Sequence, residues 1–211
     1  EVDAGGSNDL FRVMSGKDWE QLGWGITKNN FLETLFLYEG ALDDQRMISF
    51  SRGLMRSDSI RRISVCSNGL SDSGFSMLVP FLQNISHLTL LNISGNNITS
   101  EGFSSLLMAL SDSPIKELYC GGGDLQDFDI YVDEFPKDMS VLNLQENNIN
   151  ADGCRELGKL LQQGNNFALR ELYLDNNNID DEGLGILAGA LENNTSLEYL
   201  NLQNNGGITM T

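Results

Sequence analysis

The sequence has few of the residues on which catalytic and metal sites depend. Its 211 residues include 1 histidine and 3 cysteines, and Cys66, Cys120 and Cys154 show no CxxC spacing. These shortages argue against a disulfide framework, a zinc site and a nucleophile activated by histidine. We therefore expect no enzymatic activity, no metal and no cofactor. Free thiols favour a reducing, cytoplasmic compartment.

Long hydrophobic runs and basic residues are also scarce. No apolar run approaches the ~20 residues of a membrane-spanning helix, so we expect no membrane insertion. The chain has 13 basic against 30 acidic side chains, which gives a net charge of −17. Residues 121–211 hold 16 of the acidic side chains and only 4 of the basic ones. Such a field repels nucleic acid and favours a protein partner with a basic surface.

What the sequence does have is a repeat. The pattern LxxLxLxxNxI is complete from Leu88 onward, with isoleucine in one leucine place, and recurs with substitutions along the chain. Its seven copies open at residues 32, 60, 88, 115, 139, 169 and 197. Alternation within the first half of each copy predicts a strand. In four copies a glycine and two leucines follow at helical spacing, beginning at Gly74, Gly102, Gly153 and Gly183.

This pattern resembles the leucine-rich repeat family, in the ribonuclease-inhibitor-like class, and the commonest interval between copies is 28 residues. The resemblance covers roughly residues 18–211. It implies an α/β solenoid shaped as a curved horseshoe, with parallel strands on the concave face and helices on the convex face. A strand and a helix cannot bury their apolar sides alone, so the copies must stack on one another.

The repeat also suggests a division of the chain. Residues 1–31 are interpreted as an N-terminal tail and a degenerate capping repeat, and residues 32–211 as the repeat domain. Trp19 and Trp24 are expected to cover the open end of the core. Because the seventh copy stops within itself at Thr211, we expect the native chain to continue, or another chain to cover this end, within a longer protein or a complex.

The fourth copy, which opens at Ile115, is short and departs from the pattern. Only 24 residues separate its start from that of the fifth copy, and GGGDLQDFDIYVDEFPKD stands where a helix is expected. We predict an irregular segment here, with Phe128, Tyr131 and Phe135 as candidates for a hydrophobic docking surface. Its carboxylates lack the glycine and closing glutamate of a calcium loop.

Two sets of residues are candidates for different roles. The first set is a structural ladder of asparagines, whose amides would satisfy backbone groups where the chain leaves each strand: Asn68, Asn96, Asn147, Asn177 and Asn205. The second set is a protein-binding surface on the concave face: Phe36, Arg62, Glu117, Tyr119, Glu171, Tyr173, Asp175, Glu198 and Tyr199. Exposed aromatic rings beside carboxylates are typical of recognition surfaces, although strand propensity also favours tyrosine.

The leading hypothesis is a non-enzymatic protein–protein interaction module that binds its partner through the concave face. The resemblance implies related roles, such as inhibition of a basic enzyme. Two alternatives stay open at this point. One is a regulator of a small GTPase, of the activating-protein type, and the other is a structural scaffold subunit of a larger assembly.

Overall fold

The computed structural model describes residues 2–3, 13–38, 42–54, 56–163, 167–207 and 209. The strands are β1 (Val2–Asp3), β2 (Thr34–Phe36), β3 (Arg62–Ser64), β4 (Leu90–Asn92), β5 (Glu117–Tyr119), β6 (Val141–Asn143), β7 (Glu171–Tyr173) and β8 (Tyr199–Asn201). The helices are α2 (Gly16–Lys28), α3 (Asp44–Gly53), α4 (Asp72–Leu82), α5 (Ser100–Ala109), α6 (Ala151–Leu161) and α7 (Asp181–Leu191), with one 3-10 turn, η1 (Val132–Glu134).

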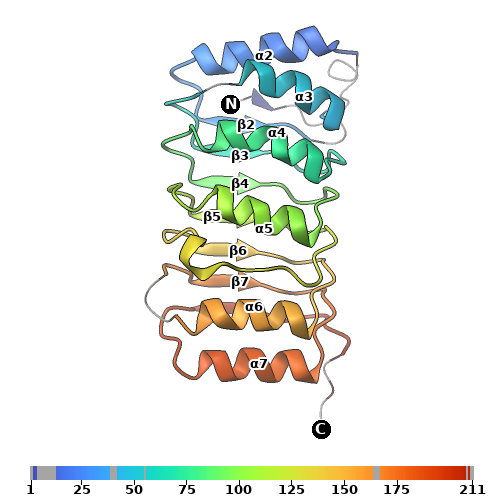
Figure 1. The fold of residues 1–211 in the computed structure, drawn as a ribbon, viewed down its shortest axis with the longest axis vertical. Coiled ribbons are helices and arrows are strands. Elements are labelled where there is room, and N and C mark those ends of the chain that lie inside the picture. Colours follow the sequence, from blue (N-terminus) through green and yellow to red (C-terminus); the bar gives the residue numbers. More distant parts are fainter. Residues whose placement is uncertain are drawn as a thin grey trace.

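The strands form a single parallel sheet in which each strand pairs with its neighbours in sequence. From β2 to β8 the register is the one that the repeat predicts, and it aligns Leu35, Ile63, Leu91, Leu118, Leu142, Leu172 and Leu200. The short fourth copy keeps this register, because its shortening falls in the return segment between β5 and β6. Figure 1 shows the ladder of strands with the helices on one side of it.

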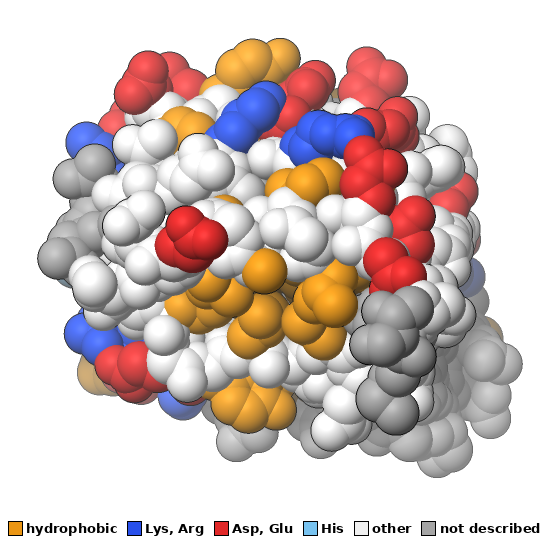
Figure 2. Space-filling model, turned by 90° about the horizontal axis from the view of Figure 1, so that it is seen from below, with side chains coloured by type: hydrophobic (Ala, Val, Ile, Leu, Met, Phe, Trp, Pro, Cys, Tyr) orange, Lys and Arg blue, Asp and Glu red, His pale blue; other side chains and the backbone are white. Residues whose placement is uncertain are grey.

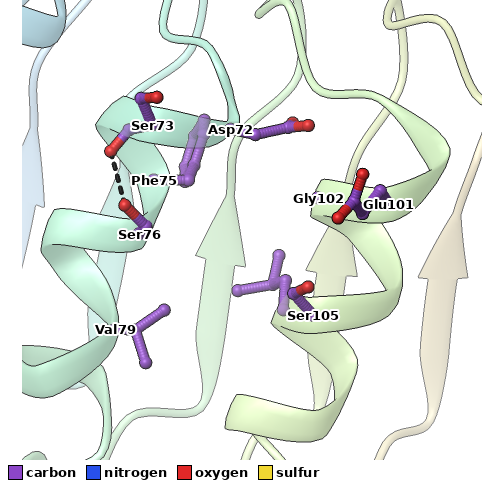
Figure 3. A pocket seen from close by; sticks show the side chains of 9 residues that line it. Asp72, Ser73, Phe75, Ser76, Val79, Glu101, Gly102 and Ser105 are labelled. Carbon is purple, nitrogen blue, oxygen red and sulfur yellow. Dashed lines mark hydrogen bonds between the residues drawn. The ribbon is translucent and has the colours of Figure 1, made fainter.

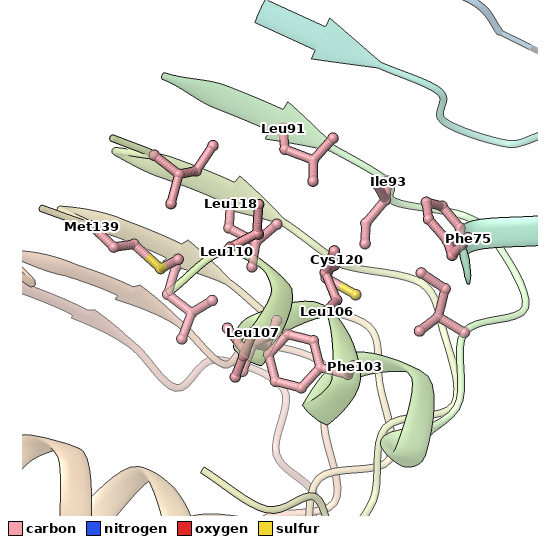
Figure 4. Packing of buried hydrophobic residues seen from close by; sticks show 14 of the residues in the cluster. Phe75, Leu91, Ile93, Phe103, Leu106, Leu107, Leu110, Leu118, Cys120 and Met139 are labelled. Atoms are coloured by element: carbon pink, nitrogen blue, oxygen red, sulfur yellow. The ribbon is translucent and has the colours of Figure 1, made fainter. Parts of the chain in front are cut away.

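The hydrophobic core lies between the sheet and the helices. Alternation along β5 turns Leu118 inward and its two neighbours outward, and the burial pattern follows this alternation. Figure 4 shows the inward strand residues facing α5, where Leu91 and Leu118 lie near Phe103 and Leu106. All four side chains are buried. Among the described residues, no helix combines the length and the hydrophobicity needed to span a membrane.

Five buried asparagines join the turns of neighbouring copies. The Oδ1 of Asn96 accepts hydrogen bonds from the backbone N–H groups of Asn68 (3.1 Å) and Leu70 (3.0 Å), which belong to the preceding copy. Its Nδ2 donates to the backbone oxygens of Val65 (2.9 Å) and Ile93 (2.8 Å). Because these bonds satisfy backbone groups that the sheet does not reach, each amide fixes a turn. Bonds of the same kind are made by Asn68, Asn147, Asn177 and Asn205.

The return segment of the fourth copy is irregular apart from η1, as the sequence indicates. Phe128 lies edge-on to Phe103 with 5.1 Å between ring centroids, and Phe135 lies edge-on to Phe167 at 5.4 Å. The prediction that Phe128 and Phe135 belong to an exposed docking surface is wrong, because both rings are buried where a helix would otherwise close the core. Of the three predicted aromatics only Tyr131 is exposed, at 54%.

The two tryptophans near the N-terminus have different environments. Trp19 is fully buried and lies edge-on to Phe50, with 5.6 Å between ring centroids. Trp24 was expected to cover the core beside it, and this prediction is wrong, because Trp24 is 43% exposed. The Nζ of Lys28 lies 5.1 Å from the centroid of the Trp24 ring. Trp24 lies five residues after Trp19 in α2, and this spacing places the two side chains on different faces of the helix.

The copy that contains β8 stands at one end of the described fold. Its leucines are half-buried, whereas their counterparts Leu169, Leu172 and Leu174 in the preceding copy are buried. Figure 2 looks at this end and shows hydrophobic side chains gathered at its centre, with acidic side chains toward its edge. The half-buried leucines are Leu197, Leu200 and Leu202.

Candidate protein-interaction surface

The outward side chains of β2–β8 and of the residues that follow each strand form one continuous surface, which we call the strand face. The register aligns Phe36, Ser64, Asn92, Tyr119, Asn143, Tyr173 and Asn201 in one column. It aligns Thr34, Arg62, Leu90, Glu117, Val141, Glu171 and Tyr199 in a second. Neighbouring strands lie about 4.8 Å apart, so residues of successive copies are within contact distance.

Two strands of this face carry the same pair of side chains. The hydroxyl of Tyr119 donates to Oε2 of Glu117 at 2.9 Å, and the hydroxyl of Tyr173 donates to Oε2 of Glu171 at 2.8 Å. Residues two apart on a strand point to the same side, which is why the sequence Glu-Leu-Tyr produces this pairing twice. Each phenol is therefore held beside a carboxylate, and both groups are half-buried.

The environment of these two tyrosines raises their pKa values. Burial is the largest cause that raises the pKa of Tyr119 to about 12, and the hydrogen bond to Glu117 comes next. For Tyr173 the order is reversed, because the hydrogen bond to Glu171 is the largest cause and raises its pKa to about 12. Both phenols therefore hold their protons to a more alkaline pH than an ordinary tyrosine does.

The structure brings the C-terminal members of the predicted set together. The rings of Tyr173 and Tyr199 lie 5.0 Å apart between centroids and are tilted by 41°, and Tyr199 is 47% exposed. The Oδ1 of Asp175 accepts a hydrogen bond from Nδ2 of Asn201 at 2.9 Å. Glu198 is engaged by an ion pair with Arg170, so its charge is partly neutralised within the surface.

The other predicted residues lie farther along the strand face. Tyr119 and Glu117 are separated from Tyr173 by β6, which places Asn143 and Val141 between them. Phe36 and Arg62 belong to β2 and β3, several strands from the tyrosine pairs. The predicted set therefore divides into an acidic, tyrosine-containing half from β5 to β8 and a separate region near β2 and β3.

The region near β2 contains a contact that the sequence prediction did not include. Tyr38 stacks on Phe36 with ring centroids 5.7 Å apart and an interplanar angle of 16°. The signal was present in the sequence, because aromatic residues two apart at a strand share one side. Nearby, the Nε of Arg62 donates to Oγ1 of Thr34 at 3.1 Å. This stacked pair gives the opposite end of the strand face an aromatic surface of its own.

The described residues differ in the chemistry that they make available. Within that part of the chain, no group of three histidine, cysteine or acidic side chains is placed to hold a metal ion. Burial raises the pKa of the thiols of Cys120 and Cys154 to about 12, which makes them poor nucleophiles. The strand face instead presents carboxylates beside aromatic rings, an arrangement that attracts cationic side chains.

Comparison with known proteins agrees with the repeat architecture. A family model described as "Leucine Rich repeat" matches residues 84–107, 138–158, 165–188 and 193–209. This chain is a leucine-rich repeat protein. Ribonuclease inhibitor of Mus musculus is 26% identical over 182 residues, which cover 82% of this chain and 40% of that protein. The repeats of this leucine-rich repeat protein are of the ribonuclease-inhibitor-like class.

Two further proteins are similar over most of this leucine-rich repeat chain. NACHT, LRR and PYD domains-containing protein 13 of Homo sapiens is 30% identical over 170 residues, which cover 78% of this chain and 16% of that protein. An internalin from Listeria monocytogenes has the same fold, with a TM-score of 0.53 and 24% identity, and the match covers 89% of this chain and 46% of that chain. The chain spans less than half the length of each of these proteins.

Proposed function

We propose that the chain is a non-enzymatic protein-interaction module, and that the part of the strand face from β5 to β8 binds a protein partner with a basic surface. The observation that carries the proposal is the pair of hydrogen bonds from Tyr119 to Glu117 and from Tyr173 to Glu171. Because each tyrosine hydroxyl donates a hydrogen bond to its glutamate, the pair holds a carboxylate in a fixed position next to an aromatic ring. A lysine or arginine of the partner can meet both at once.

Two features favour a protein over other ligands. Tyr199 and Tyr173 form a half-exposed aromatic contact, which is the kind of anchor that dominates binding energy in protein interfaces. The net charge of −17 opposes nucleic acid and anionic lipid and attracts basic proteins over a distance. Family membership supports protein recognition in general, and the position of the site on the strand face is our proposal.

The test compares partner capture by the wild-type chain with that by a variant carrying Tyr119→Ala, Tyr173→Ala and Tyr199→Ala. Partners retained at low and moderate salt are identified by mass spectrometry, and their affinities are then measured with purified protein. We expect the triple variant to lose at least about tenfold in affinity, a typical result when clustered aromatic anchors are removed. We also expect wild-type binding to weaken with salt.

Tyr131→Ala is the matched control, because Tyr131 is an exposed tyrosine in the irregular segment, away from the strand face. A second variant, Glu117→Gln with Glu171→Gln, keeps the shape of the pairs and removes their charge, so it should flatten the salt dependence. Equal binding by the triple variant and the wild type would contradict the proposal. If the captured partner is a small GTPase, the alternative that the chain regulates a small GTPase replaces the proposal of a general protein-interaction module.

A further inference from the structure

The helices do not pack on one another equally well. In α7, the residue three positions after Gly183 is Ile186, which lies against α6: a Cβ placed on Gly158 would be 3.4 Å from its Cγ2. A large side chain thus meets a glycine, and the two helices interlock. In α5 the corresponding residue, three positions after Gly102, is Ser105. The counterpart of Gly158 in α4 is Val79, five positions after Gly74, so here a small residue of α5 faces a larger one of α4.

A groove lies where this contact is weak. Between α4 and α5 there is a cavity of about 350 Å³, open to solvent, whose lining includes Phe75, Ser76, Val79, Glu101, Ser105 and Leu106. Figure 3 shows Phe75 and Val79 of α4 facing Ser105 of α5 across the gap. Phe75 and Leu106 are buried and form an apolar floor, whereas the serines and Glu101 form a polar rim. The size and lining are those of a site that accepts apolar side chains.

The two helices that form this groove, and the irregular segment beside α5, carry charges of one sign. Helices α4 and α5 and residues 120–136 contain no lysine or arginine. Helix α3, which packs against α4 on the side away from the groove, carries Arg46 and Arg52, so the anionic field is concentrated on the α5 side of the groove. The acidic residues of the same segments are Asp72, Glu101, Asp124, Asp127, Asp129, Asp133 and Glu134.

We propose that the groove between α4 and α5 docks a basic amphipathic segment of a protein partner. One apolar side chain of that segment enters the groove and contacts Phe75 and Val79. Lysine or arginine side chains beside it face Glu101 and the carboxylates of the irregular segment. An apolar floor with a charged rim is the usual anatomy of a protein interface. Because the groove lies on the opposite side of the sheet from the strand face, the two surfaces can be occupied at the same time.

The test uses three short synthetic peptides of matched length. One peptide carries a leucine flanked by lysines, a second has alanine in place of the leucine, and a third has glutamates in place of the lysines. Binding is followed by NMR through the backbone amide shifts of the isotope-labelled chain. We expect the first peptide to shift amides of α4 and α5, and the other two to bind at least about tenfold more weakly, because each lacks one of the two interactions.

Two substitutions with matched controls locate the site. Ser105→Ile places in α5 the side chain that fills the corresponding space in α7, and should weaken binding about tenfold by filling the groove. Its control is Ala188→Ile, at an exposed position of α7. Glu101→Gln should weaken binding by about threefold and reduce its salt dependence. Its control is Glu182→Gln, the residue at the same helix position in α7, and both controls should bind as the wild type does.

Several outcomes would overturn the inference. Amide shifts confined to β2–β8, or to the end formed by α7 and β8, would place the peptide outside the groove. An equal loss of peptide affinity in Ser105→Ile and Ala188→Ile would show that the groove is not the binding site. Concentration-dependent shifts in α4 and α5 without peptide would show that a second copy occupies the groove. Ser105→Ile should unfold at no lower temperature than the wild type, which separates blocking from misfolding. Retained peptide binding in the triple tyrosine variant would show that this site stands independently of the strand face.

Discussion

At the scale of single residues, the tyrosines of the strand face are positioned before any partner binds. The hydroxyls of Tyr119 and Tyr173 are both engaged by carboxylates of their own strands. Holding a side chain in place in advance lowers the entropy that must be lost on binding. The partner therefore meets rigid rings with an anion beside each, and little rearrangement is needed to recognise a cation.

The two tyrosine pairs should respond differently to loss of the carboxylate. We expect Glu171→Gln to lower the pKa of Tyr173 markedly, because the hydrogen bond to Glu171 is the largest cause of its shift. Glu117→Gln should lower the pKa of Tyr119 less, since burial is the largest cause there. Ultraviolet absorbance titration measures both values, with Tyr173→Phe and Tyr119→Phe variants used to isolate each phenol by difference. A larger effect at Tyr119 than at Tyr173 would contradict the geometry.

The same shifts determine how stability depends on alkaline pH. The folded protein holds these phenolic protons up to a pKa of about 12, whereas the ordinary value is 10.0. The folded state therefore binds more protons than the unfolded chain between these values, and stability falls as pH rises through this window. Below pH 10 the contribution is fully present, so it does not vary with pH under physiological conditions.

At the scale of elements, glycines decide how closely neighbouring helices approach. A Cβ on Gly53 of α3 would lie 2.1 Å from the backbone oxygen of Glu20 and 2.7 Å from the backbone nitrogen of Trp24, both in α2. Neither backbone atom can move without shifting the helix. A Cβ on Gly25 of α2 would meet nothing within 4 Å. Glycine is thus required at one position and costs stability at the other.

We expect Gly53→Ala to lower the free energy of unfolding by about 1–3 kcal/mol, because the added methyl group forces α2 away from α3. Gly25→Ala should raise it by about 0.5–1 kcal/mol, because alanine loses less backbone entropy than glycine in a helix interior. Urea unfolding monitored by circular dichroism measures both values. Destabilisation by both substitutions to the same extent would show that the close approach at Gly53 is unimportant.

The sequence predicts the elements well where a pattern repeats and poorly where a contact joins two copies. Alternation in each copy predicts the strands and their register, because every inward leucine has the same environment. The groove beside Ser105 could not be predicted in this way, since it depends on which residue of α4 that serine faces. The inward position of Phe128 was also missed, because an irregular segment has no period that tells which side is buried.

At the scale of the whole molecule, the net charge of −17 should have opposite effects on stability and on binding. Screening by salt weakens the repulsion among carboxylates in the compact state, so thermal unfolding should move to higher temperature as sodium chloride is added. The proposed binding to a basic partner should weaken over the same range. A tetraalkylammonium chloride should act alike, which separates screening from binding of sodium ions. An unfolding temperature that falls as sodium chloride is added would contradict this prediction.

The asparagine bonds give the solenoid a direction. Each Oδ1 accepts from backbone N–H groups of the copy before it, as Asn96 does from Leu70 and Asn205 from Ile179. A turn is thus completed by the copy that follows it in the chain. Synthesis proceeds from the N-terminus, so the turn of each newly made copy lacks its asparagine acceptor until the next copy has been synthesised. Removing copies from the C-terminal side therefore takes away the acceptors of the last remaining turn, as loss of Asn96 would do for the N–H of Leu70.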